Sequence, residues 1–341
     1  MRVAVYYNNR DVRLEERPRP AIGPGELLMR VEASGICGSD VMEWYRIKKA
    51  PIVLGHEVAG VVEEVGPGVT AFEPGDRIVT THHVPCGRCR YCESDRHSVC
   101  ETLRTTHFDP GGFSEYVRVP ALNVELGTFR LPEQVSFEEG SFVEPLACTI
   151  RAQRLAGVRW GDTVAVLGSG MSGALHIQLA KALGAECIIA TDVHPFRLGM
   201  ARRIGADAAI DARGDVPALL RVANDGRLAD RVIVCAAAPA AVRQAFECVE
   251  RGGSILFFAL MPPGTEFPLP MWDLARDGIS IVHSYAGPPA EMKEALRLLA
   301  ERRIDVTSMV THRIGLAETQ RGFGLVCDAG DSLKVIVEPQ R

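Results

Sequence analysis

Four cysteines that lie close together are the clearest chemical signal in this sequence. Cys86, Cys89, Cys92 and Cys100 supply four thiolates within fifteen residues of a loop that is rich in charge. Four thiolates at this spacing can surround a zinc ion, and such a closed site is structural because no ligand position is left for substrate. Two disulfides or an iron–sulfur cluster are the alternatives. A cytosolic setting disfavours the disulfides, and the lack of any other electron-transfer feature disfavours the cluster.

A second group of metal-ligand residue types is dispersed along the chain. Cys37, His56, Glu57 and Glu144 offer sulfur, nitrogen and oxygen ligands, which is the ligand chemistry of a zinc ion that keeps one position open for a reaction. Spacing alone does not link residues so far apart. Taken singly, Cys37 also fits a small core residue, His56 a histidine bonded to a carbonyl, and Glu144 a surface charge before a proline.

A glycine motif, Gly-x-Gly-x-x-Gly, lies between an apolar run typical of a strand and a run typical of a helix. Gly168 allows the tight turn, Gly170 has no Cβ that would block a pyrophosphate, and Gly173 lets the helix and the strand pack closely. Met171 and Ser172 lie in the same turn, at a helix N-terminus whose free N–H groups favour an anion. The motif alone can be a mere turn, but its context predicts a dinucleotide site.

An acidic residue ends the next apolar run. Asp192 lies 24 residues after Gly168, where a carboxylate is expected to bind the ribose hydroxyls. This carboxylate would repel the 2′-phosphate of NADP, so the sequence predicts NAD, with NADP as the alternative. Arg197 complicates this prediction, because it can stack on the adenine, bind a phosphate or form an ion pair with Asp192.

Composition and charge limit the class of protein. The chain has 341 residues, of which 47% are hydrophobic and 24% charged, as in globular proteins with a large core, and this length predicts two domains. A net charge of −5 offers no basic field for nucleic acid or an anionic membrane. No signal-peptide region and no apolar run of the ~18–20 residues that a membrane span needs are found. We expect a cytoplasmic protein.

The elements that position these residues change in character along the chain. Short β-branched runs separated by Gly and Pro predict a mostly β domain of barrel type up to about residue 145, with strands at 26–31, 57–65, 76–79 and 114–119. From 163 to 284, apolar strands alternate with helices, which is typical of a parallel sheet covered on both faces. The strands are expected at 163–168, 187–192, 230–235 and 254–259, and the helices at 174–183, 197–204 and 240–249.

The remaining tail has no place in that parallel sheet. A helix is predicted over 290–303 and a closing strand over 332–337, and both are assigned to the first domain. The predicted division is therefore 1–147 for a first catalytic segment, 148–284 for a nucleotide-binding domain and 285–341 for a second catalytic segment.

Several of these motifs together resemble the zinc-containing medium-chain alcohol dehydrogenases. The resemblance rests on Cys37-Gly-Ser39-Asp40, Gly55-His56-Glu57-Val-Ala-Gly60, Gly75-Asp76-Arg77, the cysteine loop and the glycine motif, in this order over nearly the whole chain. Within the family, Glu144-Pro145-Leu146-Ala147 is similar to the sorbitol and threonine dehydrogenase branch. The resemblance implies an α/β chain with a GroES-like β-barrel catalytic domain, a Rossmann domain with a doubly wound parallel sheet, and a homodimer or homotetramer.

The resemblance also implies a role for each residue of the dispersed group. Cys37 and His56 are expected to bind the catalytic zinc, and Glu57 and Glu144 to alternate as ligands or hold its water. Asp40 is expected to orient His56 through its other ring nitrogen. Ser39 is expected to accept the proton of the substrate hydroxyl while a hydride passes to the nicotinamide. With the cysteine loop, this makes two zinc ions per chain.

One position departs from the pattern of many family members. Met42 replaces the histidine that ends their proton relay, so the proton needs another route, for which Glu43 is a neighbouring candidate. His83 resembles a histidine near the substrate in threonine dehydrogenases but recurs with other substrates. The three remaining histidines of this region are interpreted as surface or loop residues: His82, His97 and His107.

The leading hypothesis is NAD-linked oxidation of a secondary alcohol on a polyol, a sugar or a similar hydroxylated small molecule. L-threonine 3-dehydrogenase is the closest alternative, although the sequence reveals no site for the substrate's ammonium and carboxylate groups. A zinc-independent quinone or enoyl reductase and a non-catalytic nucleotide sensor share the expected fold. The cysteine loop, the Cys37 and His56 pair and Asp192 disfavour both.

Overall fold

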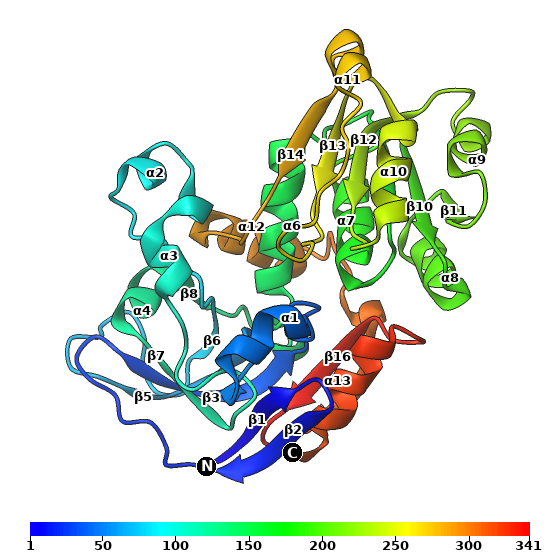
Figure 1. Cartoon of the computed structure of the whole chain (residues 1–341). Helices are drawn as coiled ribbons and strands as arrows, with labels where there is room; N and C mark the ends of the chain where they lie inside the picture. Colours follow the sequence, from blue (N-terminus) through cyan, green and yellow to red (C-terminus); the bar gives the residue numbers. More distant parts are fainter. The chain divides into compact units, whose positions relative to one another are not determined.

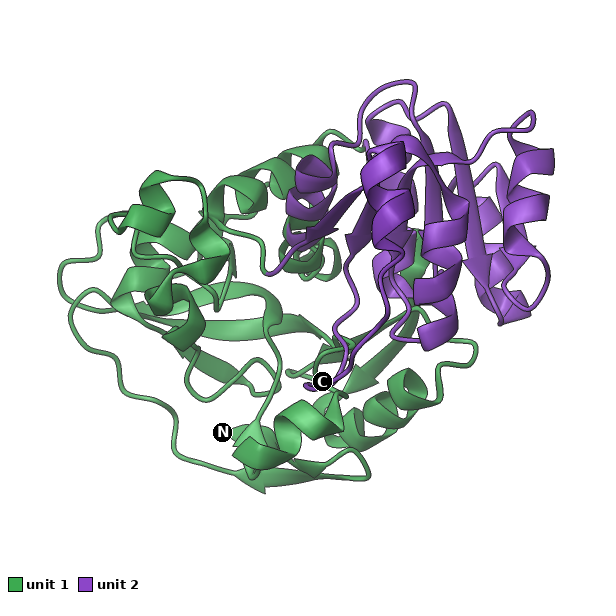
Figure 2. Cartoon of the chain, turned by 45° about the horizontal axis from the view of Figure 1, so that its top comes forward, with its two compact units in different colours: residues 1–147, 286–302, 306–341 green, residues 148–285, 303–305 purple.

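The computed structural model describes all 341 residues, Met1–Arg341, and they form two compact units (Figure 2). The first unit comprises Met1–Ala147, Ala286–Arg302 and Val306–Arg341. The second unit comprises Cys148–Tyr285 and Arg303–Asp305. In the sequence, the second unit is therefore inserted into the first.

The first unit is built on two β-sheets. A seven-stranded sheet has the order β15-β16-β3-β5-β6-β8, with β7 paired to β3, and a three-stranded sheet has the order β2-β1-β4. Gly and Pro residues separate these strands, as the sequence predicts. The strands are β1 (Arg2–Asn8), β2 (Asp11–Glu16), β3 (Leu27–Gly35), β4 (Ile52–Val53), β5 (Glu57–Val65), β6 (Arg77–Thr80), β7 (Tyr116–Val119), β8 (Thr128–Arg130), β15 (Val310–Gly315) and β16 (Lys334–Glu338).

Short helices connect the strands of this unit. None of them combines the length and apolar character that a membrane crossing requires, and the same holds for the rest of the chain. The α-helices are α1 (Glu43–Arg46), α2 (Arg90–Glu93), α3 (Glu101–Thr105), α4 (Ala121–Gly127), α5 (Phe137–Gly140), α12 (Pro289–Ala300) and α13 (Thr319–Asp328). The 3₁₀ helices are η1 (Ile47–Lys49), η2 (His97–Val99), η3 (Thr307–Met309) and η4 (Leu316–Glu318).

The C-terminal segment completes the core of the first unit (Figure 1). Strand β16 pairs antiparallel with β3, with Ile336 opposite Gly35. On α13, the buried ring of Phe323 lies 5.7 Å from the ring centroid of Tyr6 and 5.9 Å from that of Phe113. Burying such apolar side chains is the main stabilising contribution to a fold, so the last residues of the chain hold its first strand in place.

The second unit is a doubly wound parallel sheet. Its order is β11-β10-β9-β12-β13-β14, and every neighbouring pair is parallel. The two central strands therefore belong to separate halves, and a ligand is expected where the order reverses. The strands are β9 (Thr163–Leu167), β10 (Cys187–Asp192), β11 (Ala208–Asp211), β12 (Ala229–Val234), β13 (Val249–Phe257) and β14 (Ser280–His283).

Helices cover both faces of this sheet. The fully buried strand β9 alternates between two cores: Ala165 and Leu167 pack in one, and Val164 and Val166 in the other. This alternation follows from the two-residue period of a strand and explains why β9 is apolar throughout. The helices are α6 (Val143–Ala156), which begins in the first unit, α7 (Met171–Ala182), α8 (Pro195–Ile204), α9 (Val216–Ala223), α10 (Pro239–Cys248) and α11 (Met271–Asp277).

A fully buried histidine makes the stability of this unit depend on pH. His176 of α7 packs edge-on against Phe258 at 4.7 Å between centroids, and its Nδ1 lies 3.1 Å from Gln153 Nε2. Burial lowers the pKa of His176 to about 3, below the value of ~6.5 in an unfolded chain. The stabilising contribution of the neutral ring is therefore complete above about pH 6.5 and is lost as the pH falls from there toward 3.

We expect this histidine to account for about 2 kcal/mol of the unfolding free energy lost between pH 7.5 and pH 5. The measurement is urea denaturation at both pH values for the wild type and His176→Asn, which keeps an acceptor near the Nδ1 position. Between pH 7.5 and pH 5, the variant should lose about 2 kcal/mol less unfolding free energy than the wild type. Equal losses in the two proteins would show that His176 does not carry the effect.

Candidate active site and metal centres

The four cysteines of the loop converge on one point. The Sγ atoms of Cys89 and Cys92 are 3.5 Å apart, those of Cys86 and Cys100 3.7 Å, and those of Cys86 and Cys92 4.0 Å. A tetrahedron with Zn–S bonds of about 2.3 Å has sulfur atoms about 3.8 Å apart, whereas a disulfide requires about 2.05 Å. All four thiols are free. The geometry fits a zinc ion and excludes two disulfides.

Local backbone groups favour the thiolate form that a metal requires. Cys89 precedes α2 and Cys100 precedes α3. Burial acts to raise the pKa of Cys100, but hydrogen bonds from the backbone N–H groups of Cys86 and Leu103 outweigh it and lower that pKa to about 6. The distance from Cys86 N to Cys100 Sγ is 3.4 Å. Cys100 thus favours the thiolate form, whereas burial and a hydrogen bond with Cys89 raise the pKa of Cys92 to about 12.

A second group brings together the dispersed ligand types. The ligand atoms of Cys37, His56 and Glu57 all lie within 4.8 Å of one another. Strand register explains this: β3 pairs antiparallel with β5, Gly35 lies opposite Glu57, and Cys37 follows the end of β3 as His56 precedes the start of β5. Residues distant in sequence therefore meet at one end of a strand pair.

His56 is held by a buried carboxylate. Its Nδ1 lies 3.3 Å from Asp40 Oδ1, and Asp40 Oδ2 accepts a hydrogen bond of 3.1 Å from the N–H of Cys37. Burial acts to lower the pKa of His56, but the charge of Asp40 and its hydrogen bond outweigh it and raise that pKa well above the usual value. The site therefore favours positive charge at His56, and a metal ion bound at Nε2 would supply that charge in place of the proton.

Glu57 forms a completely buried ion pair that the sequence did not reveal. Its Oε2 contacts Nζ of Lys334, and both side chains are 0% exposed. Lys334 begins β16, and its ammonium lies 5.2 Å above the ring of Phe142. The other oxygen of Glu57, Oε1, is buried without a hydrogen-bond partner. A buried polar atom without a partner is costly, and a metal ion would satisfy it, so the donor set fits zinc.

Ser39 has a partner that the sequence also did not reveal. Arg46 of α1 donates from Nη2 to Ser39 Oγ at 3.2 Å and from Nε to the Ser39 carbonyl at 2.9 Å. Its Nη2 lies 3.6 Å from Asp40 Oδ1. The side chain of Glu43, in contrast, accepts a hydrogen bond from the N–H of Asn9. A guanidinium thus lies beside Ser39, near the position of Met42.

Glu144 is separate from the three clustered ligands. It is buried in the first turn of α6, but its carboxylate is not among the ligand atoms within 4.8 Å of one another. Its part in metal binding therefore stays a prediction.

Three loop histidines gather beside His56. The ring centroid of His82 lies 4.8 Å from that of His56 and 3.7 Å from that of His83. Burial and the neighbouring positive charges lower the pKa of His82, of His83 and, less strongly, of His107. We interpreted His82 from the sequence as a surface or loop residue. It does follow β6 in a loop, but it packs against a candidate metal ligand because that loop folds inward.

The glycine motif has the geometry that its sequence predicts. Gly168 follows β9 with φ +99°, and a Cβ there would lie 2.8 Å from Cβ of Ala236. A Cβ on Gly173 would lie 2.0 Å from the carbonyl oxygen of Gly168, so only glycine allows this approach of α7 to the strand. Gly170 precedes Met171 and Ser172 at the start of α7. The first N–H groups of this helix are available to an anion.

Asp192 and Arg197 both lie close to this motif. The Asp192 carboxylate accepts hydrogen bonds from the backbone N–H groups of Ser169 at 2.8 Å and His194 at 2.9 Å. The guanidinium of Arg197 would lie 3.7 Å from a Cβ placed on Gly170. Arg197 forms no ion pair with Asp192, so of the three roles considered for it, adenine stacking and phosphate binding remain.

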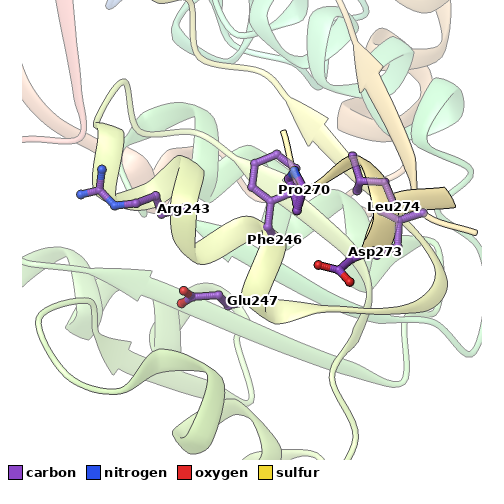
Figure 3. A pocket seen from close by; sticks show the side chains of 7 residues that line it. Arg243, Phe246, Glu247, Pro270, Asp273 and Leu274 are labelled. Atoms are coloured by element: carbon purple, nitrogen blue, oxygen red, sulfur yellow. The ribbon is translucent and has the colours of Figure 1, made fainter. Parts of the chain in front are cut away.

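One hollow of the second unit is separate from all of these groups. It measures about 310 Å³ and lies between α10 and α11 (Figure 3). Phe246, Pro270 and Leu274 give it apolar walls, and Glu247 and Asp273 lie at its edge. None of the residues that line it belongs to the metal or nucleotide groups.

Two family descriptions match this chain. Residues 23–128 match the "Alcohol dehydrogenase GroES-like domain", and residues 173–301 match "Zinc-binding dehydrogenase". A sorbitol dehydrogenase of Bacillus subtilis (strain 168) is 33% identical over 100% of this chain and 98% of its own length. The chain belongs to the zinc-binding dehydrogenase family, and the predicted fold class, a GroES-like domain with a Rossmann domain, is confirmed.

Other relatives share both domains. An L-threonine 3-dehydrogenase of Anaeromyxobacter sp. (strain Fw109-5) is 32% identical over 95% of this chain and 95% of its own length. A crystal structure of a Sinorhizobium meliloti 1021 protein, described as a zinc-binding dehydrogenase and bound to NADP, is 30% identical with a TM-score of 0.89 and covers 99% of each chain. The chain is thus an oxidoreductase of the CH–OH group that uses a nicotinamide nucleotide.

Proposed function

We propose that this protein oxidises a secondary alcohol of a polyol, a sugar or a similar hydroxylated small molecule and transfers the hydride to NAD. The observation that carries this proposal is the convergence of Cys37, His56 and Glu57 next to Ser39, whose backbone N–H donates to Cys37 Sγ at 3.4 Å. Three protein ligands leave a fourth position for substrate. The four-cysteine loop leaves none, which supports a structural role for a second zinc ion.

The residues of the first unit divide the catalytic tasks. Cys37 and His56 would hold the zinc ion, with Glu57 or Glu144 as the oxygen ligand. Bound zinc supplies a Lewis acid that lowers the pKa of the substrate hydroxyl, and the nicotinamide supplies the hydride acceptor. Asp40 fixes the orientation of the His56 ring. Ser39 is placed to take up the hydroxyl proton.

Arg46, the hydrogen-bond partner of the Ser39 hydroxyl, determines where the proton can go from Ser39. A guanidinium stays protonated in proteins, so Arg46 cannot continue a relay as a histidine would. Its hydrogen bond to Oγ instead stabilises negative charge on the oxygen atoms next to it. The proton then leaves from Ser39 to solvent.

The second unit would bind the nucleotide through Gly168, Gly170 and the start of α7. Asp192 would bind the ribose hydroxyls, which favours NAD, while the Arg197 guanidinium beside Gly170 would bind a phosphate, which favours NADP. The preference for NAD therefore depends on the negative charge of Asp192.

We expect Asp192→Asn to raise the ratio of kcat/KM with NADP to kcat/KM with NAD about tenfold. The amide keeps an oxygen acceptor but no longer repels a 2′-phosphate, and hydrogen bonds to a charged group are worth about 1.5–3 kcal/mol. Steady-state kinetics with both nucleotides measures the ratio. Asp211→Asn, at the end of the next strand and paired with Arg213, is the matched control. An equal change in both variants would argue against a role for Asp192.

A homodimer or homotetramer is supported by one edge of the second unit. β14 is the last strand of the sheet, and an open edge offers unpaired backbone groups. Nearby on α11, Met271 is 64% and Trp272 74% exposed, which is unusual for large apolar side chains of a monomer. Light scattering gives the mass in solution, and a monomeric mass would overturn this part of the proposal.

A substrate panel together with a metal assay tests the function. The purified protein is expected to contain two zinc ions per chain and to reduce NAD with secondary alcohols among polyols, sugars and amino alcohols. L-threonine is included to test the alternative function, L-threonine 3-dehydrogenase. Ethanol is included to test oxidation of a simple primary alcohol. No reduction of NAD or NADP with any secondary alcohol would overturn the proposal.

A further inference from the structure

Two cations flank an exposed aromatic ring next to the candidate active site. The guanidinium carbon of Arg46 lies 4.8 Å from the ring centroid of Tyr45, and Nζ of Lys49 lies 5.3 Å from it. Arg46 is only 15% exposed, because Ser39 accepts two of its hydrogen bonds. Both cations therefore lie against the same ring, and Arg46 is also hydrogen-bonded to the candidate proton acceptor.

Little negative charge on the protein balances these cations. The one carboxylate near Arg46 is Asp40, at 3.6 Å, and His56 shares it. Lys49 forms no ion pair, and Nη1 of Arg46 makes no hydrogen bond. The neighbouring His83 and His107 add no negative charge. Burial lowers the pKa of His83, and the charges of His56, His107, Arg46 and Lys49 lower it further. Burial, Lys49 and Arg46 lower the pKa of His107.

This arrangement resembles a binding site for an anion more than one for a neutral polyol. A guanidinium offers a planar fork of donors that matches a carboxylate or a phosphate. Ammonium groups bind the same oxygens as point charges. A neutral substrate would leave Lys49 without a counter-ion and Arg46 with only the carboxylate that it shares with His56.

We propose that Arg46 and Lys49 bind an anionic group, a carboxylate or a phosphate, carried by the alcohol substrate near its reacting hydroxyl. This inference rests on the proposed function and narrows the substrate class to acidic or phosphorylated derivatives of polyols and sugars. Ser39 connects the two parts of the site: its backbone N–H donates to Cys37 Sγ, and its hydroxyl accepts a hydrogen bond from Arg46.

Lys49 provides the cleanest test, because η1 contains a matched control. Lys48 and Lys49 are adjacent, exposed lysines of the same 3₁₀ helix, but only Lys49 has its ammonium over the ring of Tyr45. Kinetics are measured for the wild type, Lys49→Ala and Lys48→Ala with glucitol, gluconate and glucitol 6-phosphate. The wild type is expected to prefer gluconate or glucitol 6-phosphate over glucitol. Lys49→Ala should lower the ratio of anionic to neutral kcat/KM about tenfold, and Lys48→Ala should leave it unchanged.

Binding of inorganic phosphate gives a readout that does not need turnover. Calorimetry on the zinc-loaded protein without nucleotide should show phosphate binding that is weakened severalfold by Lys49→Ala and by added salt, and unchanged by Lys48→Ala. In the kinetic comparison, a preference for gluconate would show that the substrate's anionic group is a carboxylate. A preference for glucitol 6-phosphate would show that it is a phosphate.

The failure of this inference and that of the proposed function give different results. If the wild type oxidises glucitol at least as well as both anionic compounds, or if the two lysine variants behave alike, the anion site is overturned while the dehydrogenase function stands. If no alcohol reduces NAD or NADP, the proposed function fails, and the phosphate titration still decides whether Lys49 belongs to an anion site.

Discussion

The Cys37→Ala variant is expected to lose alcohol oxidation by about 10³-fold or more and to keep one zinc ion per chain. Cys37 is one of three candidate ligands within 4.8 Å of one another, so its removal leaves two of them. Lewis-acid activation of a hydroxyl is worth several kcal/mol of the barrier, and each 1.36 kcal/mol is a factor of ten in rate. Zinc analysis by mass spectrometry and NAD reduction measure the two effects.

Two further cysteine variants separate the two metal centres. Cys100→Ala should also reduce the zinc content to one ion per chain, but its main effect should be lower stability, because the closed site holds the loop between β6 and β7 together. Cys327→Ala, which replaces an exposed cysteine of α13, is the control and should keep both zinc ions.

If Cys37→Ala retains two zinc ions and wild-type activity, Cys37 is not a ligand and the proposed catalytic centre is wrong.

The two centres differ in how far they could be predicted from the sequence, and the reason is the range of their contacts. Cys86 to Cys100 lie within one loop, so their spacing alone predicts a tetrahedral site. The cluster of Cys37, His56 and Glu57 depends on the register that places Gly35 opposite Glu57. No local pattern reports such a register, so only resemblance to a family linked these residues beforehand.

Arg46 and Lys334 could not be assigned to the candidate site from the sequence. Lys334 contacts Glu57 across 277 positions of the chain, and a lysine in an apolar strand is usually taken to point to solvent. The signal that could have found it is its place at the start of a strand that is otherwise buried, Lys334–Glu338. Arg46 lies in a helix of four residues, for which no periodicity exists to show which side chains face the site.

The fold itself was predicted best where turn residues bound a short run rich in β-branched residues. The expected strands 57–65 and 187–192 coincide with β5 and β10. Helix α13 and strand β15 were not predicted. The sequence of α13 contains Gly322 and Gly324, which weaken helix propensity, and the helix is stabilised by tertiary packing of Phe323 in the core.

The Lys334→Met variant is expected to lose about 3–5 kcal/mol of unfolding free energy in the zinc-depleted protein, which is the usual cost of leaving one partner of a buried ion pair alone. Glu57 and Lys334 are both completely buried, so water cannot replace the lost ammonium. Urea denaturation after treatment with a chelator measures this loss. Lys293→Met, on the surface of α12, is a control for the loss of a lysine elsewhere in the same unit.

A double variant distinguishes the broken ion pair from the loss of packing around the lysine side chain. Glu57→Gln with Lys334→Met removes both charges, and such replacements are often close to neutral, so most of the stability should return. Zinc should reduce the loss in Lys334→Met if the unpartnered Oε1 of Glu57 faces the metal, because the cation then compensates the carboxylate in place of the ammonium. Equal losses with and without zinc would mean that Glu57 does not approach the metal, and Glu144 would then be the remaining candidate for the oxygen ligand.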